Sequence, residues 1–341
     1  MSRRAESFET RINPSEFRRS LQRWFRLRGR DLPWRRTREP YAILVSEFML
    51  QQTQVATVLP YYQRWLTRFP DFATLARADE SDVLHAWQGL GYYARARRLH
   101  AVGKFVTEHC GGQIPSESDR IAQLPGVGRY TAGAIASFAF NRSEPIVDAN
   151  IARVLARLTN WEKPIDAAPG RAHLWRTAQF LVPEKNARDH NLALMDLGAM
   201  ICRPRVAHCE ACPVRKFCQA VEPALLPRKK PHRATVYPTE HHGFTRQRDR
   251  VLLEQSYGRW QGMWILPRLA STPRRPPLVK LVFPFTHHRV TLAVFARQAP
   301  RRARANQEWF PLPAIAHLPV PSPHRRALNQ LLPVRKNAAN R

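Results

Sequence analysis

The sequence is poor in cysteine and has no long apolar run. Only five of its 341 residues are Cys, and four of these fall within residues 202–218. No uncharged apolar stretch approaches the ~18 residues that a membrane-spanning helix needs, so we expect no membrane insertion. The first residues, MSRRAESFETRINPSEFRR, lack the apolar core of a secretory signal. We therefore expect a cytoplasmic protein of bacterial type whose cysteines are not paired in disulfides.

Acidic residues are also scarce. The chain has 26 Asp and Glu against 55 Lys and Arg, which gives a formal net charge of +29. A field of this sign attracts polyanions, and nucleic acid is the first candidate. A membrane surface is the competing polyanion, but the basic residues are spread along the chain rather than gathered in one segment. Charge alone leaves a merely soluble basic surface open.

The pattern of the chain changes near residue 225. Residues 1–224 carry apolar side chains at three- and four-residue spacing, which predicts a mainly α-helical domain. Residues 225–238 are basic and contain prolines, as a linker would. Residues 239–341 contain the short β-type runs RVLLEQ, MWILP, LVKLVFPF and VTLAVFA. This second region is expected to form a smaller α+β domain.

The clustered cysteines predict a metal centre. Four thiolates at short spacing suit either zinc or an iron–sulfur cluster, and the residues alone do not decide between them. Two disulfides are the alternative, which requires an oxidising compartment. The fifth cysteine, Cys110, is most simply a packing residue. The four candidate ligands are Cys202, Cys209, Cys212 and Cys218.

A glycine turn lies in the segment LPGVG at residues 124–128. Helical patterns precede and follow it, so we expect two helices joined by a tight hairpin. Gly126 and Gly128 are both able to adopt positive φ and to expose backbone N–H groups beside a helix N-terminus, where a DNA phosphate binds well. A plain turn between two helices also favours glycine, and this reading stays open.

A carboxylate follows in EPIVDANIARVL. Asn150 is a favourable N-cap for the next helix, which places Asp148 just outside the helix N-terminus. The helix dipole favours the ionised carboxyl there, and such a charge stabilises a positive sugar during glycosidic cleavage. Without other information, helix capping is the simpler role for Asp148.

Together these motifs resemble the helix-hairpin-helix DNA glycosylase superfamily, and within it the adenine DNA glycosylase (MutY) family. The resemblance runs from about Leu32 to Cys218 and includes the spacing of the cysteines. It implies a [4Fe–4S] cluster held by those four thiolates. GRWQGMWILP and PFTHHRV resemble the family's appended Nudix-like domain, without the Nudix catalytic box. The blocks that carry the resemblance are SEFMLQQTQVATVLPYY, WQGLGYYARARRLH, LPGVGRYTAGAI and LALMDLGAMIC.

The resemblance also assigns chemistry. Glu47, on a helix with apolar neighbours, is the expected general acid that protonates adenine, because burial raises the pKa of a carboxyl. Asp148 is expected to stabilise the oxocarbenium-like sugar. Tyr130 stands where bifunctional relatives carry a lysine, and a phenol forms no imine, so we expect hydrolysis without efficient strand cleavage. Asn150 joins these three as a candidate catalytic residue.

The implied partner is double-stranded DNA with adenine opposite 8-oxoguanine or guanine, bound by a monomer. The target adenine must leave the base stack to be reached. Family positions for contacting the DNA or its bases are Arg30, Trp34 and Arg35 at the adenine pocket, Gln52 and Tyr92 around the opposite base, Gly126 and Gly128 at the phosphate, and Phe285, Thr286 and His287 in the second domain.

Two residues depart from the family pattern. Ala149 replaces a glycine, and its methyl group is expected to restrict the backbone at Asp148. Leu192 replaces a Gln or Glu, which removes one polar contact to the flipped base. Three alternatives stay open: a bifunctional glycosylase with lyase activity, another mismatch-specific glycosylase such as one for thymine, and a non-catalytic iron–sulfur DNA-binding protein.

Overall fold

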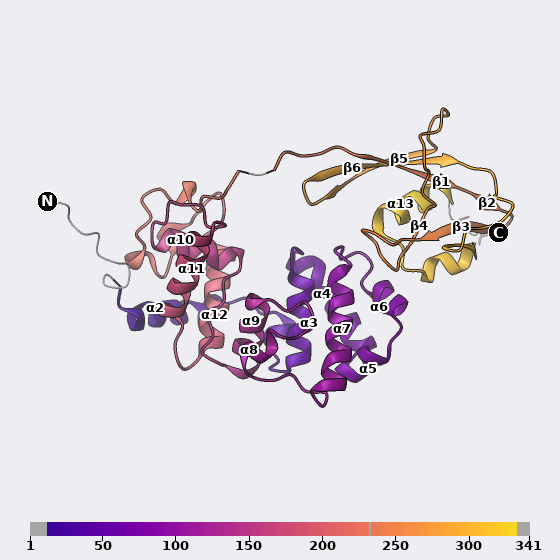
Figure 1. Cartoon of the computed structure of the whole chain (residues 1–341). Coiled ribbons are helices and arrows are strands. Elements are labelled where there is room, and N and C mark those ends of the chain that lie inside the picture. Colours follow the sequence, from indigo (N-terminus) through magenta and orange to yellow (C-terminus); the bar gives the residue numbers. More distant parts are fainter. Residues whose placement is uncertain (1–11, 232, 333–341) are drawn as a thin grey trace, which may run out of the picture. The chain divides into compact units, whose positions relative to one another are not determined.

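The computed structural model describes residues 12–231 and 233–332, and its contacts divide the chain into two compact units (Figure 1). Unit 1 comprises residues 1–55 and 105–231, and unit 2 comprises residues 56–104 and 232–341. The helices of residues 56–104 therefore group with the C-terminal region. The domain boundaries expected from composition, 1–224 and 239–341 with a linker between them, stay a prediction.

Unit 1 is helical. Its first helix begins after Asn13, whose side chain accepts hydrogen bonds from the N–H groups of Ser15 and Glu16. The helices are α2 (Pro14–Arg28), α3 (Pro40–Leu50), α8 (Ser118–Ile121), α9 (Arg129–Phe140), α10 (Ala149–Leu158), α11 (Ala168–Leu181) and α12 (Ala187–Asp196). Shorter turns are η1 (Pro33–Arg35), η2 (Leu197–Ile201), η3 (Cys209–Ala211), η4 (Arg215–Phe217) and η5 (Pro223–Leu225).

The core of unit 1 places the candidate site. Residues 41–49 of α3 and 131–139 of α9 are buried along their whole length, and the two helices pack against each other. Helix α10 carries an apolar face formed by Ile151, Val154, Leu155 and Leu158, as its spacing predicts. The N-terminal ends of α9 and α10 carry Tyr130 and Asp148, respectively.

Unit 2 combines helices with two sheets. Strand β6 pairs with β1 in parallel and with β5 in antiparallel, and β3 pairs with β2, β4 and β7. The helices are α4 (Val55–Arg68), α5 (Phe72–Arg77), α6 (Glu80–Ala86), α7 (Ala94–His109, which ends in unit 1), η6 (Leu312–His317) and α13 (Ser322–Leu331). The strands are β1 (Thr239–Phe244), β2 (Arg246–Gln247), β3 (Arg250–Gln255), β4 (Trp264–Ile265), β5 (Val279–Phe285), β6 (His288–Ala296) and β7 (Gln307–Pro311).

The expected fold class is confirmed at this level: a helical N-terminal part and a C-terminal α+β region. RVLLEQ forms β3, MWILP and LVKLVFPF contain β4 and β5, and VTLAVFA lies within β6. The Nudix-like assignment stays a prediction. Two long helical stretches are interrupted, at residues 51–54 and 87–93, where Gln52 and Tyr92 adopt positive φ. In the described ranges no helix has the length and apolar character needed to cross a membrane.

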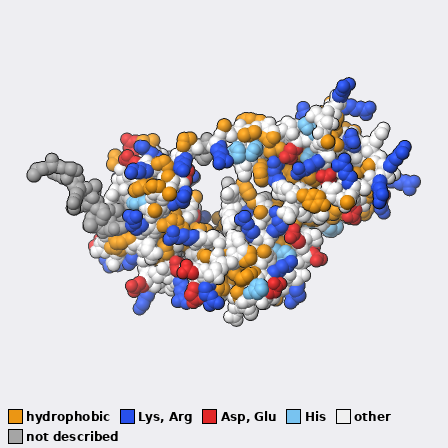
Figure 2. Space-filling model, viewed as in Figure 1, with side chains coloured by type: hydrophobic (Ala, Val, Ile, Leu, Met, Phe, Trp, Pro, Cys, Tyr) orange, Lys and Arg blue, Asp and Glu red, His pale blue; other side chains and the backbone are white. Residues whose placement is uncertain are grey.

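Lys and Arg side chains are scattered over the visible surface (Figure 2). This distribution agrees with the spread of basic residues along the sequence.

Candidate active site

Glu47 is a buried acid. It lies on α3, and only 4% of its surface is exposed. Burial raises its pKa from 4.5 to about 7; a hydrogen bond from Tyr130 opposes this shift, the charge of Asp148 adds to it, and Arg35 opposes it. A carboxyl that titrates near neutrality is suited to donate a proton to a leaving group.

Tyr130 hydrogen-bonds to Glu47 and lies within the electrostatic influence of Asp148. It is the second residue of α9, and its hydroxyl hydrogen-bonds to Glu47. Burial, followed by the charges of Glu47 and Asp148, raises the pKa of Tyr130 well above its ordinary value. The phenol therefore stays protonated and donates its hydrogen. The structure thus brings Glu47, Tyr130 and Asp148, which are far apart in the sequence, into one site.

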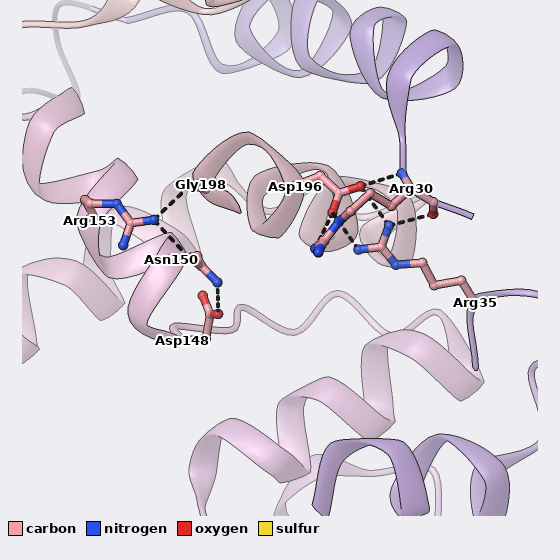
Figure 3. Close-up of polar contacts among 7 residues, drawn as sticks. All are labelled: Arg30, Arg35, Asp148, Asn150, Arg153, Asp196 and Gly198. Atoms are coloured by element: carbon pink, nitrogen blue, oxygen red, sulfur yellow. Dashed lines mark hydrogen bonds and ion pairs between the residues drawn. The ribbon is translucent and has the colours of Figure 1, made fainter. Parts of the chain in front are cut away.

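Asp148 is the N-cap of α10, so the expected N-cap at Asn150 is wrong and the simpler capping role of Asp148 is confirmed. Its Oδ1 accepts a hydrogen bond of 2.7 Å from the Ile151 N–H, and its Oδ2 accepts one of 3.0 Å from Asn150 Nδ2 (Figure 3). Asp and Asn are both favourable N-cap residues. Asp148 takes this role because it lies three positions before Ile151, whose N–H group needs an acceptor. Burial raises the pKa of Asp148, while these hydrogen bonds lower it in part.

Arg153 holds the Asn150 side chain that donates to Asp148. Its Nη2 donates to Asn150 Oδ1 at 2.9 Å and to the Gly198 carbonyl at 2.8 Å (Figure 3). Its Nε donates to the Cys202 carbonyl at 2.7 Å. The exposed Ala149 begins α10 with negative φ, a conformation that any L-residue adopts without strain.

Asp196 is a site residue that the sequence analysis missed. It ends α12, its side chain is fully buried, and two arginines hold it (Figure 3). Arg35 Nη1 and Nη2 lie 2.7 and 2.8 Å from its two carboxylate oxygens, and Arg30 donates through both Nε and its backbone N–H. Burial raises the pKa of Asp196, but Arg35 and Arg30 more than offset this and lower it. Trp34, between these arginines in sequence, is also buried.

The glycine turn is formed differently from expectation. Gly126 has φ of 72°, as predicted, but Gly128 has φ of −97° and caps α9 in an extended conformation. A Cβ atom at position 128 would meet nothing within 4 Å. Neither backbone strain nor crowding within the described chain therefore requires glycine at position 128, which leaves the turn open to a close external contact.

The four clustered cysteines line one cavity of about 340 Å³ in unit 1. All of them are free thiols. Burial raises the pKa of Cys212 to about 11, and it raises the pKa of Cys218 in the same direction. Within residues 12–231 and 233–332, no three His, Cys, Asp or Glu side chains are grouped tightly enough for a single metal ion.

Arg157 ties α10 to this cysteine segment. Only 1% of its surface is exposed, and each of its three side-chain nitrogens has a hydrogen-bond partner. It donates to the carbonyls of Arg203, Pro204 and Leu226 at 2.8, 3.0 and 3.0 Å, and Nη1 lies 3.2 Å from Cys202 Sγ. The sequence signal for Arg153 and Arg157 was available: two arginines four residues apart on an otherwise apolar helix.

Gln52, Tyr92 and Thr286, three of the candidate recognition residues, have positive φ angles. Among the described residues, those with positive φ that are neither Gly nor Asn are Gln52, Tyr92, Arg248 and Thr286. Such conformations are costly and concentrate at functional sites. Three of the four were singled out from the sequence.

In unit 2, one cavity of about 410 Å³ is lined by residues that include Tyr92, Phe285 and Thr286. Thr286 and His287 form the turn between β5 and β6. His287 packs on His288, with ring centroids 4.0 Å apart. The structure therefore brings Tyr92 and the β5–β6 turn together.

Leu192 and Cys110 are the remaining residues that the sequence singles out. Leu192 is 6% exposed and belongs to the apolar core of unit 1. Cys110 is a half-buried free thiol at the end of α7.

Known proteins similar to this chain point to one family. The model of the HhH-GPD superfamily base excision DNA repair proteins matches residues 45–179. The adenine DNA glycosylase of Rattus norvegicus is 43% identical over 241 residues, which are 64% of this chain and 46% of that protein. The adenine DNA glycosylase of Mycolicibacterium smegmatis is 40% identical over 204 residues, 60% of this chain and 68% of that protein. The chain spans less than half of the length of the mammalian relatives that it matches.

Solved structures support the same fold. A thermostable thymine-DNA glycosylase is 32% identical, with a TM-score of 0.55, over 60% of this chain and 95% of that one. A trapped endonuclease III–DNA covalent intermediate is 20% identical, with a TM-score of 0.52, over 61% of this chain and 96% of that one, and shows the fold alone. On these similarities, the chain belongs to the adenine DNA glycosylase family of HhH-GPD base excision DNA repair proteins.

Proposed function

We propose that this protein hydrolyses the N-glycosidic bond of adenine opposite 8-oxoguanine or guanine in double-stranded DNA. The observation that carries the proposal is the buried Glu47, whose pKa lies near 7 and which hydrogen-bonds to Tyr130 beside Asp148. Two carboxylates in different environments are what glycosidic hydrolysis requires, because one donates a proton while the other stays charged.

In the proposed reaction, the protonated Glu47 donates its hydrogen to N7 of the extruded adenine. The C1′–N9 bond then breaks, and its electron pair leaves with the base. The positive sugar is stabilised by Asp148, whose position is fixed by Ile151 and Asn150. A water molecule adds its hydroxyl to C1′, and its proton returns to Glu47. Tyr130 orients Glu47 through their hydrogen bond.

The proposed reaction is monofunctional. Tyr130 has no amine with which to form an imine on the sugar, so strand cleavage needs a different nucleophile. Borohydride trapping on an adenine-containing duplex tests this point. A covalent protein–DNA adduct would contradict the monofunctional reaction and favour a glycosylase with lyase activity.

The central experiment measures base release under single-turnover conditions. Duplexes carry adenine opposite 8-oxoguanine, adenine opposite guanine, or thymine opposite guanine. We expect release of adenine, and a loss of about 10²- to 10⁴-fold in Glu47→Gln because a general acid is removed. Glu39→Gln is the matched control, since Glu39 is exposed at the start of the same helix and makes no capping hydrogen bond. Release of thymine alone would assign the second specificity, which the 32% identical thymine-DNA glycosylase makes worth testing.

We propose that the four clustered cysteines hold a [4Fe–4S] cluster. A tetrahedral zinc site draws four sulfurs to about 2.3 Å from one point, whereas these four thiols border a cavity of about 340 Å³. That space fits a polynuclear cluster with one thiolate on each iron. Such a cluster supplies rigidity to the segment rather than a reaction step. Visible absorption and iron content test this assignment, and a colourless, zinc-loaded protein would refute it.

The proposed contacts to DNA are made by the residues that the resemblance indicates. The Gly126–Gly128 turn is proposed to meet a phosphate, and Gln52, Tyr92 and the β5–β6 turn to surround the base opposite adenine. Arg30, Trp34 and Arg35 are proposed to form a wall of the adenine pocket, with both guanidinium groups held by Asp196. The C-terminal region is proposed to be Nudix-like and to act in recognition. One protomer, working in the cytoplasm, is proposed to suffice for one mispair.

A further inference from the structure

Arg259 lines the cavity of about 410 Å³ in unit 2 that Tyr92 and the β5–β6 turn also line. Its guanidinium group has two kinds of partner. Nη1 forms an ion pair of 3.1 Å with Glu240, which lies on β1. Its guanidinium carbon lies 4.2 Å from the centre of the Phe285 ring and 5.2 Å from that of Trp260. The side chains of Arg259 and Glu240 are 20% and 25% exposed, so the pair is largely removed from water.

This geometry connects Arg259 to the turn. Phe285 is the last residue of β5 and directly precedes Thr286, which has φ of 52°. A non-glycine residue holds such a conformation only where its surroundings determine it. The planar guanidinium group packs on the Phe285 ring, and a lysine ammonium group cannot reproduce this flat stacking. Arg259 is thus anchored at one end by Glu240 and restrains the turn at the other.

The cavity has the chemistry of a base-recognition site. Its aromatic walls offer stacking surfaces, and guanidinium donors suit a purine that carries a carbonyl oxygen. The two non-glycine residues with positive φ in its lining, Tyr92 and Thr286, come from different parts of the chain. Two basic side chains, Arg259 and Arg326, belong to the cavity lining.

We propose that Arg259 is a positioning residue for recognition of the base opposite the target adenine. It holds the Phe285–Thr286 turn against the cavity, and through this turn it sets the preference for 8-oxoguanine over guanine. The inference rests on the proposed function, because that function supplies the identity of the opposite base.

The test measures binding, so that it does not depend on base release. Fluorescence anisotropy gives Kd for duplexes that carry a non-hydrolysable adenosine analogue opposite 8-oxoguanine or opposite guanine. The ratio of these two Kd values is compared in the wild type and in Arg259→Lys, which keeps the charge toward Glu240 but loses the stacking. We expect the preference for 8-oxoguanine to fall by about 2- to 30-fold.

Two further variants serve as a second test and as a control. Glu240→Gln removes the anchor but leaves the stack, and we expect a smaller fall in the same direction. Arg250→Gln removes an exposed charge at the start of β3, outside the cavity lining, and we expect the wild-type ratio. Thermal melting of each variant shows whether unit 2 is still folded.

The outcomes separate the two proposals. A wild-type ratio in Arg259→Lys with unchanged melting overturns the role of Arg259, as does a wild type without preference for 8-oxoguanine. Adenine release from natural duplexes is followed in parallel. If release is absent while the binding ratio depends on Arg259, the proposed reaction is wrong and the inference about Arg259 stands.

Discussion

Replacing Glu47 with Gln should weaken catalysis and strengthen the fold, and the second effect depends on pH. Glutamine keeps the size of the side chain and its hydrogen bond with Tyr130, but it has no charge to bury. In the wild type, burial raises the pKa of Glu47 from 4.5 to about 7. The folded protein therefore holds this proton more tightly than the unfolded chain does.

The sign and size follow from this difference. For a carboxyl with a raised pKa, the stabilising contribution is fully present below about pH 4.5 and is lost as the pH rises through about 7. Each pKa unit corresponds to about 1.4 kcal/mol, so the complete loss is on the order of 3 kcal/mol. Glu47→Gln does not suffer this loss. Between pH 5 and pH 8.5, its advantage over the wild type should grow by about 2–3 kcal/mol, or roughly 4–12 °C in melting temperature.

Thermal melting of both proteins at pH 5 and pH 8.5 provides the assay, with Glu39→Gln as the control for removal of an exposed carboxylate. Because each comparison is made at one pH, the titration of other groups largely cancels. If the difference in melting temperature between Glu47→Gln and the wild type is the same at pH 5 and at pH 8.5, Glu47 is not a buried carboxyl that titrates near pH 7. In the wild type, the rate of base release should decline as the pH rises through about 7, since only the protonated acid donates.

Three other substitutions test the surroundings of the site. Asp148→Asn keeps a favourable N-cap residue, so the melting temperature should change little. The single-turnover rate of base release should fall by about 10²-fold or more. A large loss of stability would instead show that the role of Asp148 is mainly structural. Asp196→Asn leaves Arg30 and Arg35 without their shared carboxylate, and the free energy of unfolding measured in urea should fall by about 3 kcal/mol. An unchanged free energy of unfolding would show that neither ion pair stabilises the fold. Arg157→Met keeps the apolar stem but loses the donors to residues 203, 204 and 226. Its iron content per chain should fall, and a wild-type value would contradict the supporting role of Arg157.

Local patterns made part of this site predictable. The apolar neighbours of Glu47 indicated burial, and burial is the largest cause of its raised pKa. The β-type run at residues 250–255 became β3 because a short apolar run between polar residues is typical of a buried strand, and residues 251–254 are buried. In each case the physical cause acts over a few neighbouring residues.

Features that depend on distant partners were not predictable in this way. Asp196 is held by two arginines more than 160 positions earlier in the chain, and nothing near it in sequence indicates them. The choice between Asp148 and Asn150 as N-cap was equally open, because both side chains accept hydrogen bonds from a helix N-terminus. The grouping of residues 56–104 with the C-terminal region also rests on long-range contacts.

The hydrogen bonds of Arg153 explain how an architectural cysteine segment bears on the candidate chemistry. From Cys202 a chain of direct contacts runs through Arg153 to Asn150 and then to Asp148. Arg153 is 7% exposed, so each of these hydrogen bonds forms largely away from water, where a lost partner is costly. A shift of the Cys202 carbonyl would therefore leave the Arg153 guanidinium group without one acceptor and release Asn150 from its orientation. Because Asn150 is one of the two donors that fix the Asp148 carboxylate, disorder in the cysteine segment should reduce the rate of base release even though no cysteine contacts the substrate.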